Sequence, residues 1–388
     1  MMLIIAASLA IFVYGMVASM LGTINPGLAI RFHLDNVQTS YIALAQGIGL
    51  VIASVSVGPL LDKKGKKVGL LLGLSAVIVS LVILANADGY PAMMFSMALM
   101  GLGGGITITA ANALGSDVSE TRRASVLNFL NVFVGLGGLL TPFVAGNLLA
   151  GDAKKVAYCG AALSAVALLF QFALKLPKKI EAGVAPASSR VFKQPLLYGI
   201  ALTVLLYTAC EFAIWNWLPK FLVAEGVPQA QALNILALGF ALALLLGRVA
   251  ITPVLMKVQP LTVTTFCSIA MAVCTWFVLQ TSNPQTAGIL VFCTGLAMAP
   301  VFPTSIALIG NLFKEGTATA IGFTITCGFS GLVLSSPIIG WLSGPDPQGL
   351  RTGLLLLPVS SIIMSVLYLA LRAPISGRTQ PLAARQAT

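Results

Sequence analysis

The chain has 388 residues, of which 58% are hydrophobic and 9% are charged, and its formal net charge is +11 at pH 7. The mean hydropathy of +0.98 is too high for a water-exposed surface, which excludes an ordinary soluble domain. The positive charge does not indicate nucleic-acid binding, because Lys and Arg lie in short turns between apolar runs and not on one helix face. The composition predicts an all-α membrane protein.

Apolar runs long enough to cross a bilayer recur along the whole chain. In the first half, spanning helices are expected at residues 3–30, 39–61, 68–87, 91–114, 124–149 and 156–174. In the second half they are expected at residues 195–219, 230–254, 259–280, 284–309, 318–342 and 350–371. The prediction is therefore twelve transmembrane helices.

The two halves share a pattern. Tyr14 and Pro26 recur as Tyr207 and Pro219 at a common offset, which indicates a duplicated unit of six helices. Such a duplication predicts two pseudo-symmetric six-helix bundles with a binding site between them near the bilayer midplane. The expected domains are an N-terminal bundle at 1–174, a cytoplasmic linker at 175–194, a C-terminal bundle at 195–372 and a cytoplasmic tail at 373–388.

The basic residues predict the orientation in the membrane. Most Lys and Arg residues fall in the loops on one side of the predicted helices, and Lys154 and Lys155 are the main exceptions. Because cytoplasmic loops carry the excess of Lys and Arg, both termini are expected in the cytoplasm of a multi-pass protein of the inner (plasma) membrane. We expect a monomer embedded in the lipid bilayer.

The turn between the second and third helices reads Gly-Pro-Leu-Leu-Asp-Lys-Lys-Gly-Lys-Lys over residues 58–67. Asp62 ends a helix, where the macrodipole disfavours an acid, so its carboxylate needs a cation or another helix N-terminus nearby. We expect a conformational latch here, with an ordinary charged loop as the alternative. Its candidate residues are Gly58, Asp62, Lys63, Gly65, Lys66, Lys67, Asp117, Arg122, Arg123 and, as a second latch, Arg248.

One acid lies deep within an apolar run. Glu211 is about 16 residues, or about 24 Å, from the predicted start of the seventh helix. Burying its carboxylate costs roughly 2.5 to 3.5 kcal/mol, so it should face a cavity or carry a proton. Tyr207 and Trp215 share its helix face, and Asn216 is adjacent. This face suits a sugar, because pyranose rings combine C–H faces with hydroxyl edges; the alternative is a structural acid bonded to a neighbouring helix.

Candidate solute-binding residues in the first half are uncharged. Amide side chains can read solute hydroxyls through paired donors and acceptors, or they can simply join helices to one another. The candidates are Asn128 and Asn131 on the fifth helix, Thr109 and Asn112 on the fourth, and Gln46 on the second.

The 58–67 turn resembles the signature of the major facilitator superfamily between its second and third helices. Two further stretches resemble the fucose-permease and glucose-transporter branch: Leu127-Asn128 through Gly137, and Tyr207 with Glu211 and Trp215. That resemblance implies uptake of a monosaccharide with protons or sodium. The chain departs from the branch because its first and fourth helices hold no embedded acid, which leaves Glu211 for proton coupling or else simple facilitated diffusion.

Three classes of function compete. The first is a secondary transporter that moves a small sugar-like solute by alternating access, with a proton, or else sodium, as the coupling ion. The second is a proton-driven efflux antiporter for drugs or metabolites, or a facilitative uniporter. An intramembrane enzyme or receptor is disfavoured, because the only histidine lies in a predicted loop and no nucleophile motif, metal cluster or phosphate-binding loop is present. No cofactor is expected.

Overall fold

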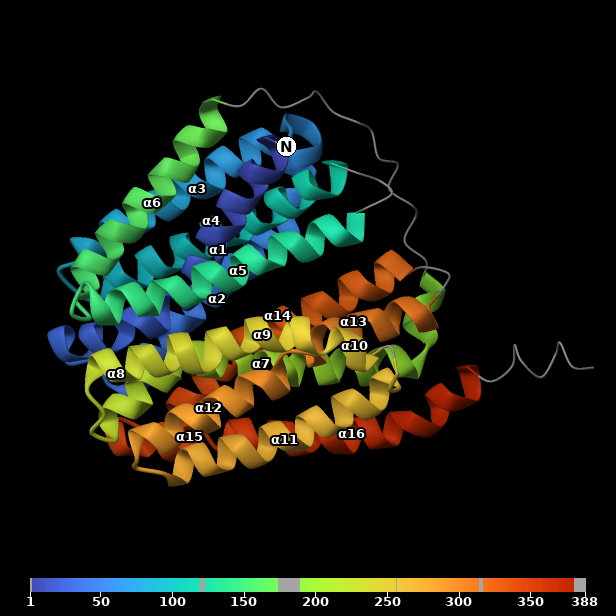
Figure 1. Cartoon of the computed structure of the whole chain (residues 1–388). Helices are drawn as coiled ribbons and strands as arrows, with labels where there is room; N and C mark the ends of the chain where they lie inside the picture. Colours follow the sequence, from blue (N-terminus) through green and yellow to red (C-terminus); the bar gives the residue numbers. More distant parts are fainter. Residues whose placement is uncertain (1, 119–122, 174–188, 256, 314–316, 380–388) are drawn as a thin grey trace, which may run out of the picture.

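The structure, a computed structural model, describes residues 2–118, 123–173, 189–255, 257–313 and 317–379. Within this part, twelve helical stretches are long and apolar enough to cross a membrane, which confirms the predicted all-α architecture. Figure 1 shows them as two bundles that lie side by side, with the first half of the chain in one and the second half in the other.

The first bundle is built from continuous helices that pack around two apolar cores. The α2–α3 turn is tighter than expected, since Gly65 alone separates the two helices. Its φ of 88° is a conformation that glycine adopts without a steric cost. The helices are α1 (Met2–Phe32), α2 (Asn36–Lys64), α3 (Lys66–Ala85), α4 (Tyr90–Val118), α5 (Arg123–Asn147) and α6 (Ala153–Ala173).

The second bundle has more broken helices. A π-helical segment, η2, interrupts its second span, and its fourth span breaks at Ala299 and Pro300. Its elements are η1 (Ser189–Lys193), α7 (Pro195–Ala224), α8 (Gln229–Asn234), η2 (Ile235–Ala241), α9 (Leu242–Ala250), α10 (Thr252–Leu255), α11 (Pro260–Gln280), α12 (Pro284–Met298), α13 (Val301–Leu312), α14 (Thr317–Ser343), η3 (Pro347–Gly349), α15 (Leu350–Gly353) and α16 (Leu356–Thr379).

The seventh span corrects one predicted boundary. The sequence predicts that it ends at Pro219, but α7 continues through Pro219 to Ala224. A proline inside a helix removes one backbone donor, and packing against neighbouring helices compensates for this in membrane proteins. Lys220, predicted as a loop residue, therefore lies in the helix and is only 7% exposed.

At one end of the molecule, here called the closed end, polar contacts join the two bundles. The Lys220 ammonium donates to Thr39 Oγ1 at 2.8 Å, and the Asn25 amide donates to the Asn216 carbonyl at 3.2 Å. Asn147 and Asn234 form a reciprocal amide pair with distances of 2.6 and 3.1 Å. These bonds fix α1, α2 and α5 of the first bundle against α7 and α8 of the second.

At the opposite end, here called the linker end, α2 and α14 diverge, as Figure 1 shows. A Cβ added at Gly340 on α14 would overlap Ser40 on α2, and one at Gly47 would lie 3.2 Å from Val333. Further toward the linker end, a Cβ at Gly58 or Gly322 would meet nothing within 4 Å. The two bundles therefore contact one another at the closed end and diverge toward the linker end.

Candidate functional site

Glu211 forms an ion pair inside the second bundle. Its Oε1 lies 3.9 Å from Nη2 of Arg248 on α9, and the side chains of Glu211 and Arg248 are 15% and 31% exposed, respectively. A carboxylate and a guanidinium within an apolar span each carry a large desolvation cost, which pairing reduces. The pair is therefore a strong candidate for function.

The directions of the two helices explain why these side chains meet. Helical side chains lean toward the N-terminus of their own helix. Because α7 runs from the linker end to the closed end and α9 runs back, the side chains of Glu211 and Arg248 lean toward one another. Two residues at different depths along their helices thereby come into contact.

The π-helical segment η2 sets which face of α9 Arg248 occupies. It covers seven residues, Ile235–Ala241, in the middle of the span that ends at Ala250. A π-helical turn holds more residues than an α-helical turn, so it rotates everything downstream around the helix axis. Arg248 follows this segment by two turns, and its approach to Glu211 depends on that rotation.

Aromatic side chains surround the carboxylate on α7. The Tyr207 hydroxyl is fully buried, lies within electrostatic range of Glu211 and Arg248, and has no hydrogen-bond partner among the described residues. Trp215, 7% exposed, packs edge-to-face on Phe240 with ring centroids 5.1 Å apart. A flat apolar surface and an unsatisfied hydroxyl thus flank one acid.

The first bundle covers the site from across the interface. Tyr14 on α1 packs with Leu50 and Leu332 in a small apolar cluster between the bundles, and its hydroxyl interacts electrostatically with Glu211. A Cβ at Gly138 on α5 would lie 3.0 Å from the Trp215 ring. Trp215 therefore contacts both bundles. A relative movement of the bundles would change the packing around Trp215, which lies one helical turn from Glu211.

The other predicted binding residues are used differently. Gln46 donates to the Val17 carbonyl at 3.1 Å, Thr109 donates to the Gly105 carbonyl at 2.8 Å, and the Asn216 side chain is buried at the interface. The Gln46 contact joins α2 to α1, and the Thr109 contact lies within α4, so both side chains serve the helix packing. Asn131 is exposed and Asn112 is half-buried, whereas the side chain of Asn128 lies outside the described residues.

The latch prediction is only partly visible. Lys66 Nζ donates to the Ala113 carbonyl and Lys67 Nζ donates to the Phe172 carbonyl, both at 3.1 Å. Both contacts hold the α2–α3 turn to the C-terminal parts of helices within the first bundle, where cations are favoured. Lys63 is exposed. The side chains of Asp62, Asp117 and Arg123, and all of Arg122, lie outside the described residues, so the latch remains a prediction.

Sequence reasoning missed the ion pair, since it assigned Arg248 to a second latch and left Glu211 without a counter-ion. The structure adds this contact: the guanidinium of Arg248 lies beside the carboxylate of Glu211, and the latch role of Arg248 remains a prediction. The sequence did contain a signal for this pair, because an acid and a base occur in consecutive spans that run in opposite directions. In the described part of the chain, no cluster of three or more His, Cys, Asp or Glu residues could hold a metal ion.

The sequence was compared with known families and proteins. A model of the Major Facilitator Superfamily matches residues 7–336. A protein TsgA homolog of Erwinia tasmaniensis is 23% identical over 337 residues, covering 84% of each chain. An uncharacterized MFS-type transporter of Bacillus subtilis, YfkL, is 26% identical over 330 residues, covering 80% of this chain and 81% of that protein.

Solved structures share the fold. A point mutant of the nucleoside transporter NupG superposes with a TM-score of 0.79 at 17% identity, covering 95% of this chain and all (100%) of that one. A D-xylose-proton symporter superposes with a TM-score of 0.77 at 13% identity, covering 95% of this chain and 96% of that one. The inward-open xylose transporter XylE of E. coli gives a TM-score of 0.74 at 12% identity, with 95% of both chains covered.

Proposed function

The chain belongs to the Major Facilitator Superfamily, and on that premise we propose that it moves a small polyhydroxylated solute, such as a sugar or a sugar-containing compound, by alternating access. It is a transporter and not an enzyme. The observation that carries the solute class is the group formed by Glu211, Tyr207 and Trp215 at the bundle interface. An indole face stacks on C–H surfaces, while a carboxylate and a free hydroxyl bind hydroxyl groups.

The structural neighbours support the same solute class. One is a D-xylose-proton symporter and another is a nucleoside transporter, and both kinds of solute contain a pentose ring. At identities of 13% and 17% these neighbours share the fold, so the argument for this chain depends on its own side chains.

A binding screen tests the solute class. The purified protein is heated with a panel of pentoses, hexoses, nucleosides, polyols, organic acids and lipophilic cations, and the unfolding temperature is recorded. We expect stabilisation by a sugar or nucleoside, and loss of that stabilisation in Trp215→Leu. Trp276→Leu is the matched control, since Trp276 on α11 is 48% exposed and outside the site. Stabilisation by lipophilic cations alone would contradict the proposal and favour an exporter of drugs.

We further propose that Glu211 carries the coupling proton. A protonated Glu211 no longer attracts Arg248, so protonation frees the guanidinium for the solute or for another acceptor. Both side chains are partly exposed, so a proton and a solute can reach them. Binding of the proton therefore alters the affinity for the solute, and binding of the solute alters the affinity for the proton. This is the requirement for coupled transport.

Proton movement can be measured directly. In proteoliposomes that contain a pH-sensitive dye, addition of the solute found in the screen should acidify the lumen, and Glu211→Gln should abolish this signal. Glu225→Gln is the control, because Glu225 follows the last residue of α7 and pairs with Arg351 at 2.7 Å outside the site. Solute entry that depends on sodium, or entry without any proton signal in the wild type, would assign coupling elsewhere or indicate a uniporter.

The linker end is proposed to face the cytoplasm. The basic turn at residues 63–67 and the basic end of α16 lie at this end, in agreement with the excess of cytoplasmic Lys and Arg in membrane proteins. In this orientation, the end at which the two bundles diverge is the cytoplasmic end. A fluorescent protein fused to the C-terminus should be fluorescent if that end is cytoplasmic, whereas a periplasmic alkaline phosphatase fused there should be inactive.

A further inference from the structure

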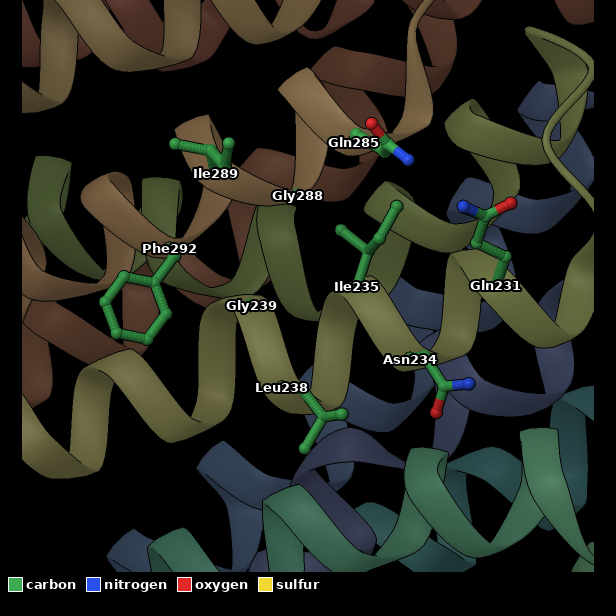
Figure 2. A pocket seen from close by; sticks show the side chains of 9 residues that line it. All are labelled: Gln231, Asn234, Ile235, Leu238, Gly239, Gln285, Gly288, Ile289 and Phe292. Atoms are coloured by element: carbon green, nitrogen blue, oxygen red, sulfur yellow. The ribbon is translucent and has the colours of Figure 1, made fainter.

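A groove of about 420 Å³ crosses the outer surface of the second bundle, between α12 and the segment formed by α8 and η2 (Figure 2). Gly239 and Gly288 form its floor, and Leu238, Ile289 and Phe292 line its apolar part. Leu238 is 44% exposed and Ile289 is 65% exposed. Because both helical segments belong to spans, this surface faces the bilayer and not water.

Three amide side chains lie at one end of the groove, as Figure 2 shows: those of Gln231, Asn234 and Gln285. They are within the first six residues of the spans that begin at Gln229 and Pro284, so they lie at about the depth of the lipid headgroups. Within the described part of the chain, the groove is lined by no Lys, Arg, Asp or Glu. Its polar end thus offers neutral N–H donors at the height of phosphate and ester oxygens.

We propose that this groove binds one membrane phospholipid, with an acyl chain along the glycine floor and its phosphate and ester oxygens at the three amides. The apolar length excludes a soluble polar ligand, and the amide donors complement the oxygen acceptors of a headgroup. The π-helical segment supplies part of the shape, because its wider turn carries Ile235, Leu238 and Gly239 along the groove.

The bound lipid also contacts the interface between the bundles. Asn234 lines the groove and holds Asn147 of the first bundle through the reciprocal amide pair. Gln229, at the start of the same short helix, donates to the Gly151 carbonyl at 3.0 Å. A lipid that packs α8 against α12 therefore stabilises the arrangement in which the closed end is shut, since α8 provides both contacts.

A second groove on the membrane surface lacks the polar end. It has a volume of about 380 Å³ between α11 and α16 and is lined by apolar side chains and Ser365. The Ser365 hydroxyl lies 2.9 Å from Ser268 Oγ and 2.8 Å from the Ser361 carbonyl oxygen, so its one proton already has acceptors within the bundle. This groove can contact acyl chains without recognising a headgroup, and it is the internal control for the first.

Photocrosslinking tests the proposal. The protein is reconstituted in vesicles of phosphatidylethanolamine and phosphatidylglycerol that contain a phosphatidylethanolamine with a diazirine in its acyl chain. After illumination, the labelled peptides are identified by mass spectrometry. We expect residues 229–241 and 284–292 to be labelled more strongly than α11 and α16.

Gly288→Leu should displace the lipid. A Cβ at Gly288 would meet only Ile235 Cγ1, at 3.7 Å, so a larger side chain enters the groove without a backbone clash. Labelling of the groove should fall by roughly tenfold, as expected when several methylene contacts are lost. Leu246→Phe, an exposed apolar change on α9 outside the groove, should leave the labelling unchanged.

A second variant separates headgroup recognition from folding. Gln231→Leu combined with Gln285→Leu removes two donors from exposed positions and should lower groove labelling several-fold, while labelling along α11 and α16 stays constant. The proposal is overturned if groove labelling is unchanged in this variant and in Gly288→Leu, or if the wild type is labelled evenly over its membrane surface. Neither result bears on the solute screen, so the two proposals fail independently.

Discussion

The two bundles share a fold but differ in where they keep their charges. Among the described side chains of the first bundle, charged residues inside the spans are confined to the helix ends, as at Arg31, Lys66 and Lys155. The second bundle holds Glu211 in the middle of a span and pairs it with Arg248. The duplicated architecture therefore carries unequal chemistry, and we assign the proposed coupling function to the second half.

The first bundle contributes the side chains and backbone that pack against the second bundle. Gly22 and Gly138 approach Trp215 closely, and Tyr14 packs in the cluster that includes Phe212 of α7. Asn25 and Asn147 form bonds across the closed end. In the proposed mechanism, the second bundle changes its protonation at Glu211, and the first bundle responds through the residues that contact α7. The following predictions test this division, from the largest expected effect to the smallest.

Arg248→Leu should have the largest effect. Removing one partner of this partly buried ion pair leaves the other charge without compensation, so we expect solute uptake to fall by about a hundredfold or more. The thermal stability of the protein should fall as well. The double variant Glu211→Gln with Arg248→Gln should recover the stability but not the coupling, because it leaves no unpaired charge in the span and no carboxylate to carry the proton. Normal uptake by Arg248→Leu would remove the pair from the mechanism.

Gly22→Val should prevent the closed end from shutting. A Cβ at this position would overlap the Trp215 carbonyl oxygen of the other bundle, and overpacking of this kind costs roughly 1 to 3 kcal/mol or more. Spin labels at Asp88, in a loop, and at Gln348, in η3, are both exposed at the closed end and should move apart in distance measurements. Gly310→Val is the control, because a Cβ there would meet nothing within 4 Å. Unchanged distances would show that this contact is not needed for closure.

Thr39→Val should weaken the same closure to a smaller extent. It removes an acceptor at 2.8 Å from the buried Lys220 ammonium, and a lost hydrogen bond to a charged group costs about 1.5 to 3 kcal/mol. The fraction of molecules open at the closed end should rise in the distance measurement. Thr23→Val, whose hydroxyl donates within its own helix to Ser19, should not change it. Equal effects of the two changes would indicate a general loss of packing.

Asn147→Ala should give the smallest of these effects. It breaks a neutral and partly hydrated amide pair with Asn234, which is worth about 0.5 to 1.5 kcal/mol. We expect a few-fold increase in opening. Asn86→Ala removes contacts confined to the first bundle, with Val82 and Tyr158, and should leave the opening unchanged. A larger effect for Asn86 than for Asn147 would contradict the assignment of the inter-bundle contacts.

The fold could be predicted from the sequence because a bilayer requires long apolar helices with polar connections. Long apolar runs separated by basic turns have few alternatives in a membrane, and the twelve predicted helices are confirmed. The tight turn at Gly65 was also readable, since glycine in a short polar turn signals an unusual backbone conformation.

The pairing inside the site could not be read in the same way. The contact between Glu211 and Arg248 depends on the lean of side chains on antiparallel helices and on the rotation introduced at Ile235–Ala241. A π-helical segment has no distinctive composition, so the face of Arg248 was not predictable. Lys220 was missed for a related reason, because α7 passes through Pro219 instead of ending there.

The division between the bundles is tested most directly by accumulation under a pH gradient. Proteoliposomes with wild-type protein, loaded at neutral pH and moved to acidic medium, should concentrate the solute found in the screen. Glu211→Gln should lose this accumulation yet still exchange internal for external solute, because the binding surfaces remain. Accumulation by Glu211→Gln equal to that of the wild type would contradict the account.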